Sequence, residues 1–346
     1  MKNICSLLLI VILAVSVNAQ FNAEKTPLIT QSLTTADIKS VLAETSGGSI
    51  TITGVPVNEA KLEVFVVPNN YRENPLSEEE IRQRMKEFYE VKFLAGNNKL
   101  TATAKANKNM GWEKSLNFSF KIYVPKNVSA DLSTSGGSIS LKNLSGTLEF
   151  RTSGGVLNVD NVSGRINGRT SGGSISLENS EGDIELSTSG GSINASHCKA
   201  NLKLHTSGGS LNLEDLDGNI SASTSGGSIV GRNISGELVS HTSGGNIQLS
   251  DLACSLETST SGGNIRVSIT TFGKYVRISN SSGHIELNLP KGKGLDLDLS
   301  ADKITTGQLE NFSGKMEDDE VKGKLNGGGV PVTVHAGSGK IILGIK

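Results

Sequence analysis

Apolar and polar side chains alternate along most of this chain, and the alternation itself repeats. In the stretch 134–151, TSGGSISLKNLSGTLEFR, Ile139 and Leu141 alternate with polar residues, and Leu148 and Phe150 do the same nine residues later. A period of two is typical of a β-strand with one buried and one exposed face. The stretch therefore predicts two short strands, each followed by a turn.

The same pattern returns every eighteen residues. The letters TSGG open eight successive units, at 134, 152, 170, 188, 206, 224, 242 and 260. We number positions within a unit from its first threonine. The sixth position is always aliphatic: Ile139, Leu157, Ile175, Ile193, Leu211, Ile229, Ile247 and Ile265. A fixed period of this length indicates an all-β solenoid, in which each unit is one coil and the apolar positions stack into a core.

Each unit divides into two nonapeptides, because Gly137 and Gly146 are nine residues apart. We expect a flattened coil with two parallel sheets, two strands per coil, and a right-handed path by analogy with other parallel crossovers. A three-sided coil and a left-handed hexapeptide helix are the alternatives, and the nine-residue half-repeat counts against the latter. The TSGG glycines are expected to supply positive φ at the chain reversals, with Thr and Ser forming hydrogen-bonded ladders.

The amino-terminal segment 1–19 has the features of a signal peptide. A lysine precedes an apolar run of about eleven residues, and small residues end at Ala19. The run is short for a membrane anchor, which needs about twenty residues. We therefore expect an exported protein, located in the periplasm, on the outer surface or in the medium of a bacterium, with no transmembrane segment after cleavage.

Three further segments follow from the register of the repeat. Residues 20–133 form an amino-terminal cap and the first coils, including an isolated ETSGGSITITG unit at 44–54; 134–290 form the regular solenoid; 291–346 form irregular carboxy-terminal coils and a cap. Strands are expected at 62–67, 91–94, 99–105 and 116–124.

One short helix is expected at 77–90. Ser77 and Glu80 have the spacing of a capping box, and Ile81, Met85 and Phe88 share one face. We expect this face to cover the first coil, because an open solenoid end exposes unpaired strand edges. The alternative is a partner-binding helix.

Charge and side-chain chemistry exclude several functions. Basic and acidic residues nearly balance, 33 against 34, and no basic run appears, so no nucleic-acid partner is expected. Cys198 and Cys254 lie three coils apart, about 14 Å, too far for a disulfide, and should be free thiols. The histidines lie too far apart to share a zinc ion and are expected on the surface. Leu141 occupies the position at which a calcium β-roll would have its ligand aspartate. No cofactor, no metal site and no catalytic residue is predicted.

The fifth and seventh positions point outward from one sheet and are almost uncharged. This face supplies a candidate surface-contact ladder, made of Ser138, Ser140, Ser174, Ser176, Ser192, Asn194, Ser210, Asn212, Asn246 and Gln248. Such a face could bind an envelope protein or a surface glycan. The alternative is structural, because in-register stacking of coils disfavours repeated charge and selects small polar groups.

Three stretches resemble a known family. They are FKIYVPKNVSADLSTSGGSISL before the first regular coil, the recurring LSGTLEFRTSGG, and GKLNGGGVPVTVHAGSGKIIL near the end. They are similar to a bacterial adhesin family, a domain of unknown function with glycine-rich β-solenoid repeats, whose adhesin label is itself a prediction. The resemblance implies a β-solenoid fold and a setting in the bacterial envelope, and it carries no catalytic residues.

The predicted function is therefore a non-enzymatic, exported envelope protein, adhesin-like or a scaffold, which binds a partner through a solenoid face. One alternative is a glycan-binding or glycan-degrading β-helix protein, for which Asp183 and Glu185 are the only paired carboxylates considered. Another is a periplasmic partner of a membrane signalling system that makes contact through the amino-terminal cap. The sequence carries no signal for an oligomeric state.

Overall fold

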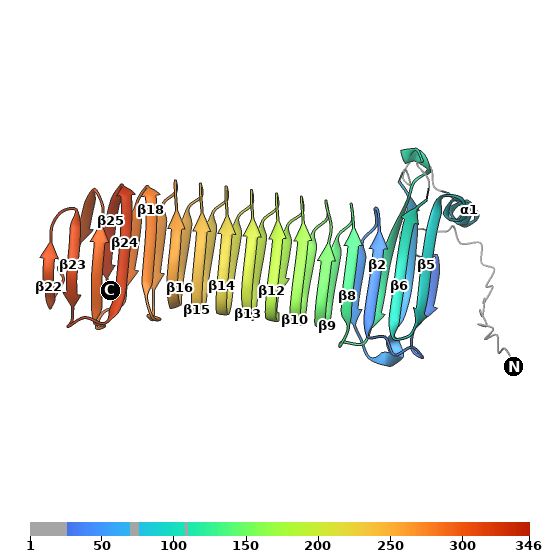
Figure 1. Cartoon of the computed structure of the whole chain (residues 1–346), viewed down its shortest axis with the longest axis horizontal. Coiled ribbons are helices and arrows are strands. Elements are labelled where there is room, and N and C mark those ends of the chain that lie inside the picture. Colours follow the sequence, from blue (N-terminus) through green and yellow to red (C-terminus); the bar gives the residue numbers. More distant parts are fainter. Residues whose placement is uncertain (1–25, 70–75, 108–109) are drawn as a thin grey trace.

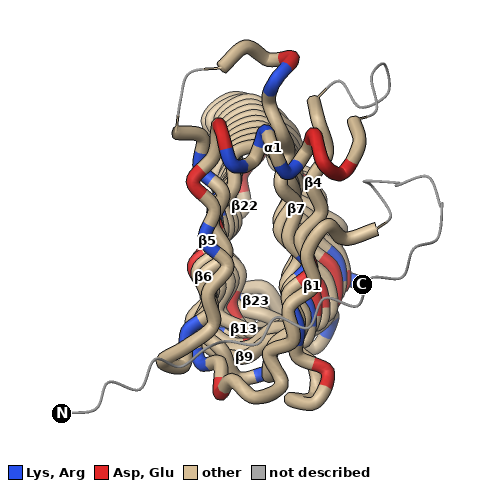
Figure 2. The backbone as a smooth tube through the Cα atoms, turned by 90° about the vertical axis from the view of Figure 1, so that its right-hand side faces the viewer, with Lys and Arg blue, Asp and Glu red and all other residues tan. Residues whose placement is uncertain are grey.

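The chain forms a β-solenoid, a long stack of coils with a cap at each end (Figure 1). A computed structural model describes residues 26–69, 76–107 and 110–346. The predicted signal peptide at 1–19 lies outside the described residues. Viewed along its axis, the stack is a flattened tube with two long sides (Figure 2). Within the described residues, no helix combines the length and the apolar composition needed to cross a bilayer.

The regular coils are parallel strands in register. They are β8 (Ser129–Thr134), β9 (Ile139–Arg151), β10 (Leu157–Thr170), β11 (Ile175–Glu178), β12 (Glu181–Thr188), β13 (Ile193–Thr206), β14 (Leu211–Thr224), β15 (Ile229–Thr242), β16 (Ile247–Thr260) and β17 (Ile265–Ile269). Each residue pairs with the residue eighteen positions later, as Ile193 does with Leu211. We call the side that carries positions five to nine the first sheet, and the side that carries positions fourteen to eighteen the second sheet.

The predicted apolar columns form the core. All eight residues of the sixth position are at most 1% exposed, and Leu148, Ile166 and Ile184 of the fifteenth position are also buried. A further buried column at position eleven, which sequence analysis overlooked, contains Leu144, Val162, Ser180, Cys198, Leu216, Ile234 and Leu252. The core therefore continues around the corner that joins the two sheets.

Positive φ occurs at that corner and not at TSGG, so the expectation for the TSGG glycines was wrong. The residues at position ten have φ between 52° and 57°: Asn143, Asn161, Asn179, His197, Asp215, Asn233 and Asp251. Asn and Asp tolerate this left-handed conformation better than other residues with a Cβ. The glycines at position thirteen, such as Gly146, also have positive φ. Among the described residues, no glycine of a TSGG sequence does.

The TSGG turns instead bring the backbones of successive coils very close together. A Cβ on the second glycine, for example Gly209, would overlap the carbonyl group of Gly191 in the preceding coil. The threonine side chain connects the same two glycines: Thr206 Oγ1 donates to Gly191 O (2.8 Å) and accepts from Gly209 N (3.2 Å). Glycine is required here for close approach, and threonine for the bridge between coils.

The isolated TSGG unit at the amino terminus belongs to the same stack. Its strands β2 (Ser40–Thr45) and β3 (Ile50–Gly54) pair directly with β8 and β9. The residues inserted between β3 and β8 fold outward as the cap, with β4 (Lys61–Pro68), β5 (Tyr89–Gly96), β6 (Lys99–Ala106), β7 (Leu116–Val124) and the 3-10 helices Val57–Glu59 and Trp112–Lys114. The strand β1 (Ile29–Ser32), which precedes the isolated unit, joins the cap by pairing with β4. Strands therefore occur in all four predicted segments.

The predicted helix is α1 (Glu78–Phe88), and it begins with the expected capping box. Ser77 N donates to Glu80 Oε2 (2.8 Å), and Glu80 N donates to Ser77 Oγ (3.3 Å). Ile81 and Met85 are buried, as expected for a covered face. The helix packs on β4, β5 and β7, however, and not on the first coil, because these cap strands already cover that coil (Figure 2).

The carboxy-terminal strands do not follow one another in space. The longer coil after Thr260 supplies β18 (Val276–Ser282) and β19 (Ile285–Leu289), which pair with the last two strands of the chain, β24 (Val330–Ser338) and β25 (Lys340–Ile345). Beyond these lie β20 (Leu295–Ser300) and β21 (Lys303–Thr306). The antiparallel strands β23 (Glu320–Leu325) and β22 (Phe312–Met316) form the outer end of the second sheet. The closing segment of the sequence is thus an inner layer of the stack.

Candidate functional site

The ten residues of the predicted contact ladder lie on the outer surface of the first sheet, and those at position five have a structural use. Ser138 Oγ accepts a hydrogen bond from Val156 N (3.3 Å), and Ser192 Oγ accepts one from Ser210 N (3.2 Å) in the next coil. Ser210 Oγ accepts from Ser228 N in the same way (3.2 Å). These hydroxyls satisfy backbone donors where the strands begin, which favours the structural explanation for this half of the ladder.

The residues at position seven are partly engaged with each other. Asn212 Nδ2 donates to Asn194 Oδ1 (2.7 Å), and Ser176 Oγ donates to Glu178 Oε1 (3.1 Å). The amide pair joins neighbouring coils across the surface, as cross-strand polar pairs do in other sheets. The central part of the first sheet is therefore largely polar, and many of its side chains bond within the protein, while Val156 and Val230 are exposed on the same face.

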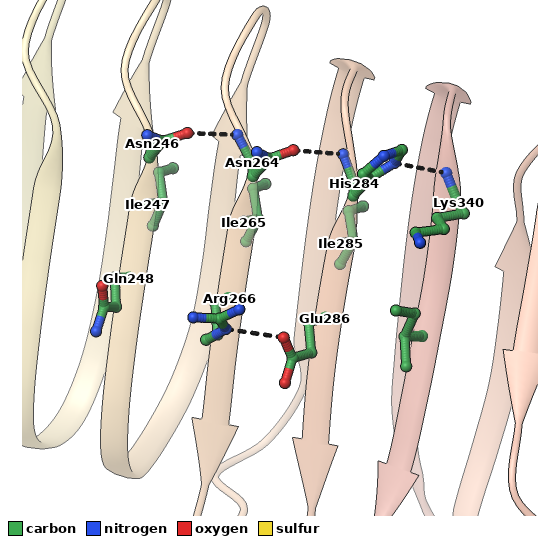
Figure 3. Close-up of a pocket in the computed structure, with 11 residues that line it drawn as sticks. Asn246, Ile247, Gln248, Asn264, Ile265, Arg266, His284, Ile285, Glu286 and Lys340 are labelled. Carbon is green, nitrogen blue, oxygen red and sulfur yellow. Dashed lines mark hydrogen bonds and ion pairs between the residues drawn. The ribbon is translucent and has the colours of Figure 1, made fainter.

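The ladder changes in character towards the carboxy-terminal end, where larger side chains follow the serines at position five (Figure 3). Asn246 Oδ1 accepts from Asn264 N (2.8 Å), and Asn264 Oδ1 accepts from His284 N (2.9 Å). His284 Nδ1 then accepts from Lys340 N (3.3 Å). Each side chain thus caps the next strand, as the serines do.

These bonds fix which atoms remain for a ligand. Because the Oδ1 atoms accept from backbone N–H groups, the Nδ2 groups of Asn246 and Asn264 are left as donors. Because Nδ1 of His284 accepts a hydrogen bond, the neutral ring carries its proton on Nε2. Lys340 adds an ammonium group. We call Asn246, Asn264, His284 and Lys340 the donor row; its members are about 4.8 Å apart along the stack.

The donor row lines a shallow groove of about 410 Å³, which also includes Gln248, Arg266, Glu286 and Ile342. Arg266 Nε donates to Glu286 Oε2 (2.8 Å). This hydrogen bond is the main reason that the pKa of Glu286 lies below its usual value. Arg266 and Glu286 neutralise each other, so the ammonium of Lys340 leaves the groove with one net positive charge.

Only part of this groove could be predicted from the sequence. Of the ten predicted ladder residues, Asn246 and Gln248 line it, and the other eight lie outside it. His284 and Glu286 belong to the coil that is stretched by two residues, and Lys340 comes from β25 at the end of the chain. A regular eighteen-residue alignment places none of these three beside Asn264. The twenty-residue spacing between the TSGG at 260 and Asn280 places His284 and Glu286 in the next coil, whereas no signal in the sequence places Lys340 there.

The paired carboxylates considered for glycan cleavage lie on the second sheet, in a separate groove of about 360 Å³. Asp183 Oδ1 accepts from Asn201 Nδ2 (2.8 Å), and Glu185 Oε1 lies 3.5 Å from Lys203 Nζ. Both carboxylates are therefore paired with groups of the next coil in the same way as other ladder residues. This arrangement supplies no distinct acid and base for hydrolysis.

Cys198 and Cys254 are free thiols, as predicted, and both are buried. Burial raises the pKa of both thiols, to about 12 for Cys254, so neither is a thiolate at neutral pH. Within the described ranges, no three His, Cys, Asp or Glu side chains gather as a metal site would require.

Comparisons with known proteins identify the family. No curated protein matches the chain. One similar solved structure is a "putative cell adhesion protein" from Clostridium sporogenes, 14% identical over 90% of this chain and 94% of that chain, with a TM-score of 0.18. Another is a "putative adhesin" from Bacteroides fragilis, 12% identical over 91% and 96%, with a TM-score of 0.26. These scores are too low for either structure to indicate a function. The profile of the Toastrack DUF4097 domain matches residues 90–343, and the chain therefore belongs to the Toastrack DUF4097 family.

Proposed function

We propose that this protein is a non-enzymatic, adhesin-like binding protein of the bacterial cell envelope, which holds its partner in the donor-row groove. One observation supports this proposal: the acceptor atoms of Asn246, Asn264 and His284 already accept hydrogen bonds from backbone N–H groups. It leaves a series of donors on an otherwise flat surface. A partner rich in acceptor oxygens, either a surface glycan or an envelope protein, would satisfy them.

The architecture supports a binding role because it holds these donors in place before a partner arrives. Backbone hydrogen bonds join each coil to its neighbours, and the side chains of Asn246, Asn264 and His284 each accept a hydrogen bond from the next strand. A preorganised surface loses little conformational entropy on binding. Export is part of the proposal and rests on the sequence of residues 1–19.

The test replaces the two amides without disturbing the ladder. In Asn246→Ser/Asn264→Ser, the serine hydroxyls can accept the same backbone N–H groups, as Ser192 and Ser210 do at this position, but the outward amide donors are lost. Two lost hydrogen bonds at about 0.7 kcal/mol each should weaken binding about tenfold. Binding of the mature protein to isolated bacterial envelope fragments, titrated to saturation, measures this.

The matched control is Asn201→Ser/Asn219→Ser on the second sheet, where Ser255 occupies the same position of another coil. It removes the same groups far from the groove and should bind like the unchanged protein. Equal binding by all three proteins would refute the donor row as the contact site. Release of sugar products from the fragments by the unchanged protein would instead establish the enzymatic alternative.

A further inference from the structure

The edge of the stack formed by the TSGG turns carries a third groove, of about 620 Å³, which the proposed function does not use. Its charged and titratable lining residues are Arg151, Arg169 and His205, all at position eighteen. The exposed hydroxyls of position two, among them Ser135, Ser153 and Ser171, line the other side. We call these six residues the arginine edge.

The groove contains cations without carboxylates. None of its lining residues is Asp or Glu. Glu185 lies outside the groove and contacts Arg169, with 3.8 Å between its Oε1 and an Arg169 nitrogen. The Arg169 side chain nevertheless remains 64% exposed. Within the described residues, Arg151 forms no ion pair. The protein as a whole has almost balanced charge, so this edge is a local concentration of positive charge.

The two arginines also differ from the paired cations of other ladders. Cations of other ladders face an anion of the adjacent coil: Lys142 lies 3.4 Å from Asp160, and Arg232 is paired with Glu214. Arg151 and Arg169 are instead direct register partners on neighbouring strands. Like charges in this relation repel each other. An anionic ligand between the two guanidinium groups would convert this repulsion into attraction.

The chemistry of the groove indicates which anion fits. Guanidinium groups bind carboxylate, sulfate and phosphate oxygens with two parallel hydrogen bonds, and the serine hydroxyls can bond to further oxygens. The lining has no aromatic or large apolar side chain, which the centre of a protein interface usually contains. In the following coils, position eighteen is again neither Asp nor Glu: it is occupied by Ser187, Ser223, His241 and Ser259. The surface therefore suits a long, hydrated, anionic chain.

We propose that the arginine edge binds an anionic polysaccharide, which lies along the TSGG turns with an acidic group between Arg151 and Arg169. This site is on the edge opposite the position-ten corner and is separate from the donor-row groove. It can therefore succeed or fail independently of the proposed function.

The test uses Arg151→Ser/Arg169→Ser, because Ser133 and Ser187 occupy position eighteen in the adjacent coils. The control Arg165→Asn/Arg277→Thr removes two arginines from the same sheet outside the groove. Asn201 occupies the position of Arg165 two coils further along, and Thr333 is the register partner of Arg277. The probes are dextran sulfate, polygalacturonate, neutral dextran and polyglutamate. Binding is measured by titration at low and at physiological salt, and folding is checked by circular dichroism.

We expect the unchanged protein to bind the sulfated or the carboxylated polysaccharide, more weakly as salt rises, and to ignore neutral dextran. The Arg151→Ser/Arg169→Ser variant should lose at least about tenfold in affinity, whereas the control should stay within about twofold. The donor-row variant Asn246→Ser/Asn264→Ser should bind these polymers unchanged. The proposal is overturned if neither acidic polysaccharide binds, if the arginine variant and the control lose equally, or if polyglutamate binds as tightly as the polysaccharides.

Discussion

The substitution Gly209→Ala is expected to lower the free energy of unfolding by about 3 kcal/mol or more, near the upper end of the cost of overpacking. The new Cβ would overlap the carbonyl group of Gly191 and lie 2.7 Å from Ser192 N. All of these atoms belong to the backbone of the preceding coil, so no side-chain rotation relieves the clash. The midpoint of urea unfolding, compared with that of the unchanged protein, measures the effect.

The neighbouring glycine supplies a matched control. A Cβ on Gly208 would have its nearest contact at 3.5 Å, with Ser189 O, which is an ordinary van der Waals distance. Gly208→Ala should therefore leave the unfolding midpoint nearly unchanged. Similar midpoints for the two variants would contradict the conclusion that the second glycine of TSGG is required for close approach of successive coils. A larger loss of stability for Gly208→Ala than for Gly209→Ala would also contradict it.

The substitution Thr206→Val is expected to cost about 2–5 kcal/mol. Valine has a similar shape, but Gly191 O loses its donor and Gly209 N loses its acceptor, and a buried polar group without a partner costs about 1–3 kcal/mol. Thr206 is completely buried, so water cannot replace the hydroxyl without opening the turn. Thermal and urea unfolding should both show the loss.

Thr206→Ser separates the hydroxyl from the packing of the side chain. It retains both hydrogen bonds and removes one methyl group, which should cost only about 0.8 kcal/mol. If Thr206→Ser were as destabilising as Thr206→Val, the packing of the methyl group, and not the bridge between the glycines, would explain why threonine opens every unit of this chain. If neither variant changed stability, the threonine ladder would have no structural role.

The regular coils could be predicted from the sequence because their information is local and repeated. A period of eighteen, with Ile175 and Ile193 in one column, determines both the partner strand and the buried face. The capping box at Ser77 is equally local, since it depends on residues three positions apart. These features need no knowledge of long-range contacts.

The features that sequence analysis missed depend on geometry between coils. The TSGG sequence does not show whether its glycines are needed for positive φ or for close approach of two backbones. The structure answers this, because Gly191 lies directly against Gly209. Asn233 at position ten looks like an ordinary polar residue until its φ of 52° is known.

The complete donor row could not be predicted, because Lys340 is brought to it by the carboxy-terminal end of the fold. Lys340 lies beside His284 only because β25 inserts between β19 and β21. The ten ladder residues were chosen for regularity, whereas the groove occurs where the regularity ends. In a repeat protein, positions that depart from the repeat are therefore the more informative candidates for binding.

The stacking of one coil per eighteen residues is tested most directly by distances between spin labels on the first sheet. Labels at Ser140 and Asn212 are four coils apart, and labels at Ser140 and Gln248 are six coils apart. The two distances should be about 19 Å and about 29 Å, allowing for the label arms, so that the difference is about 10 Å. Equal distances, or a shorter distance for the second pair, would contradict the stacked solenoid.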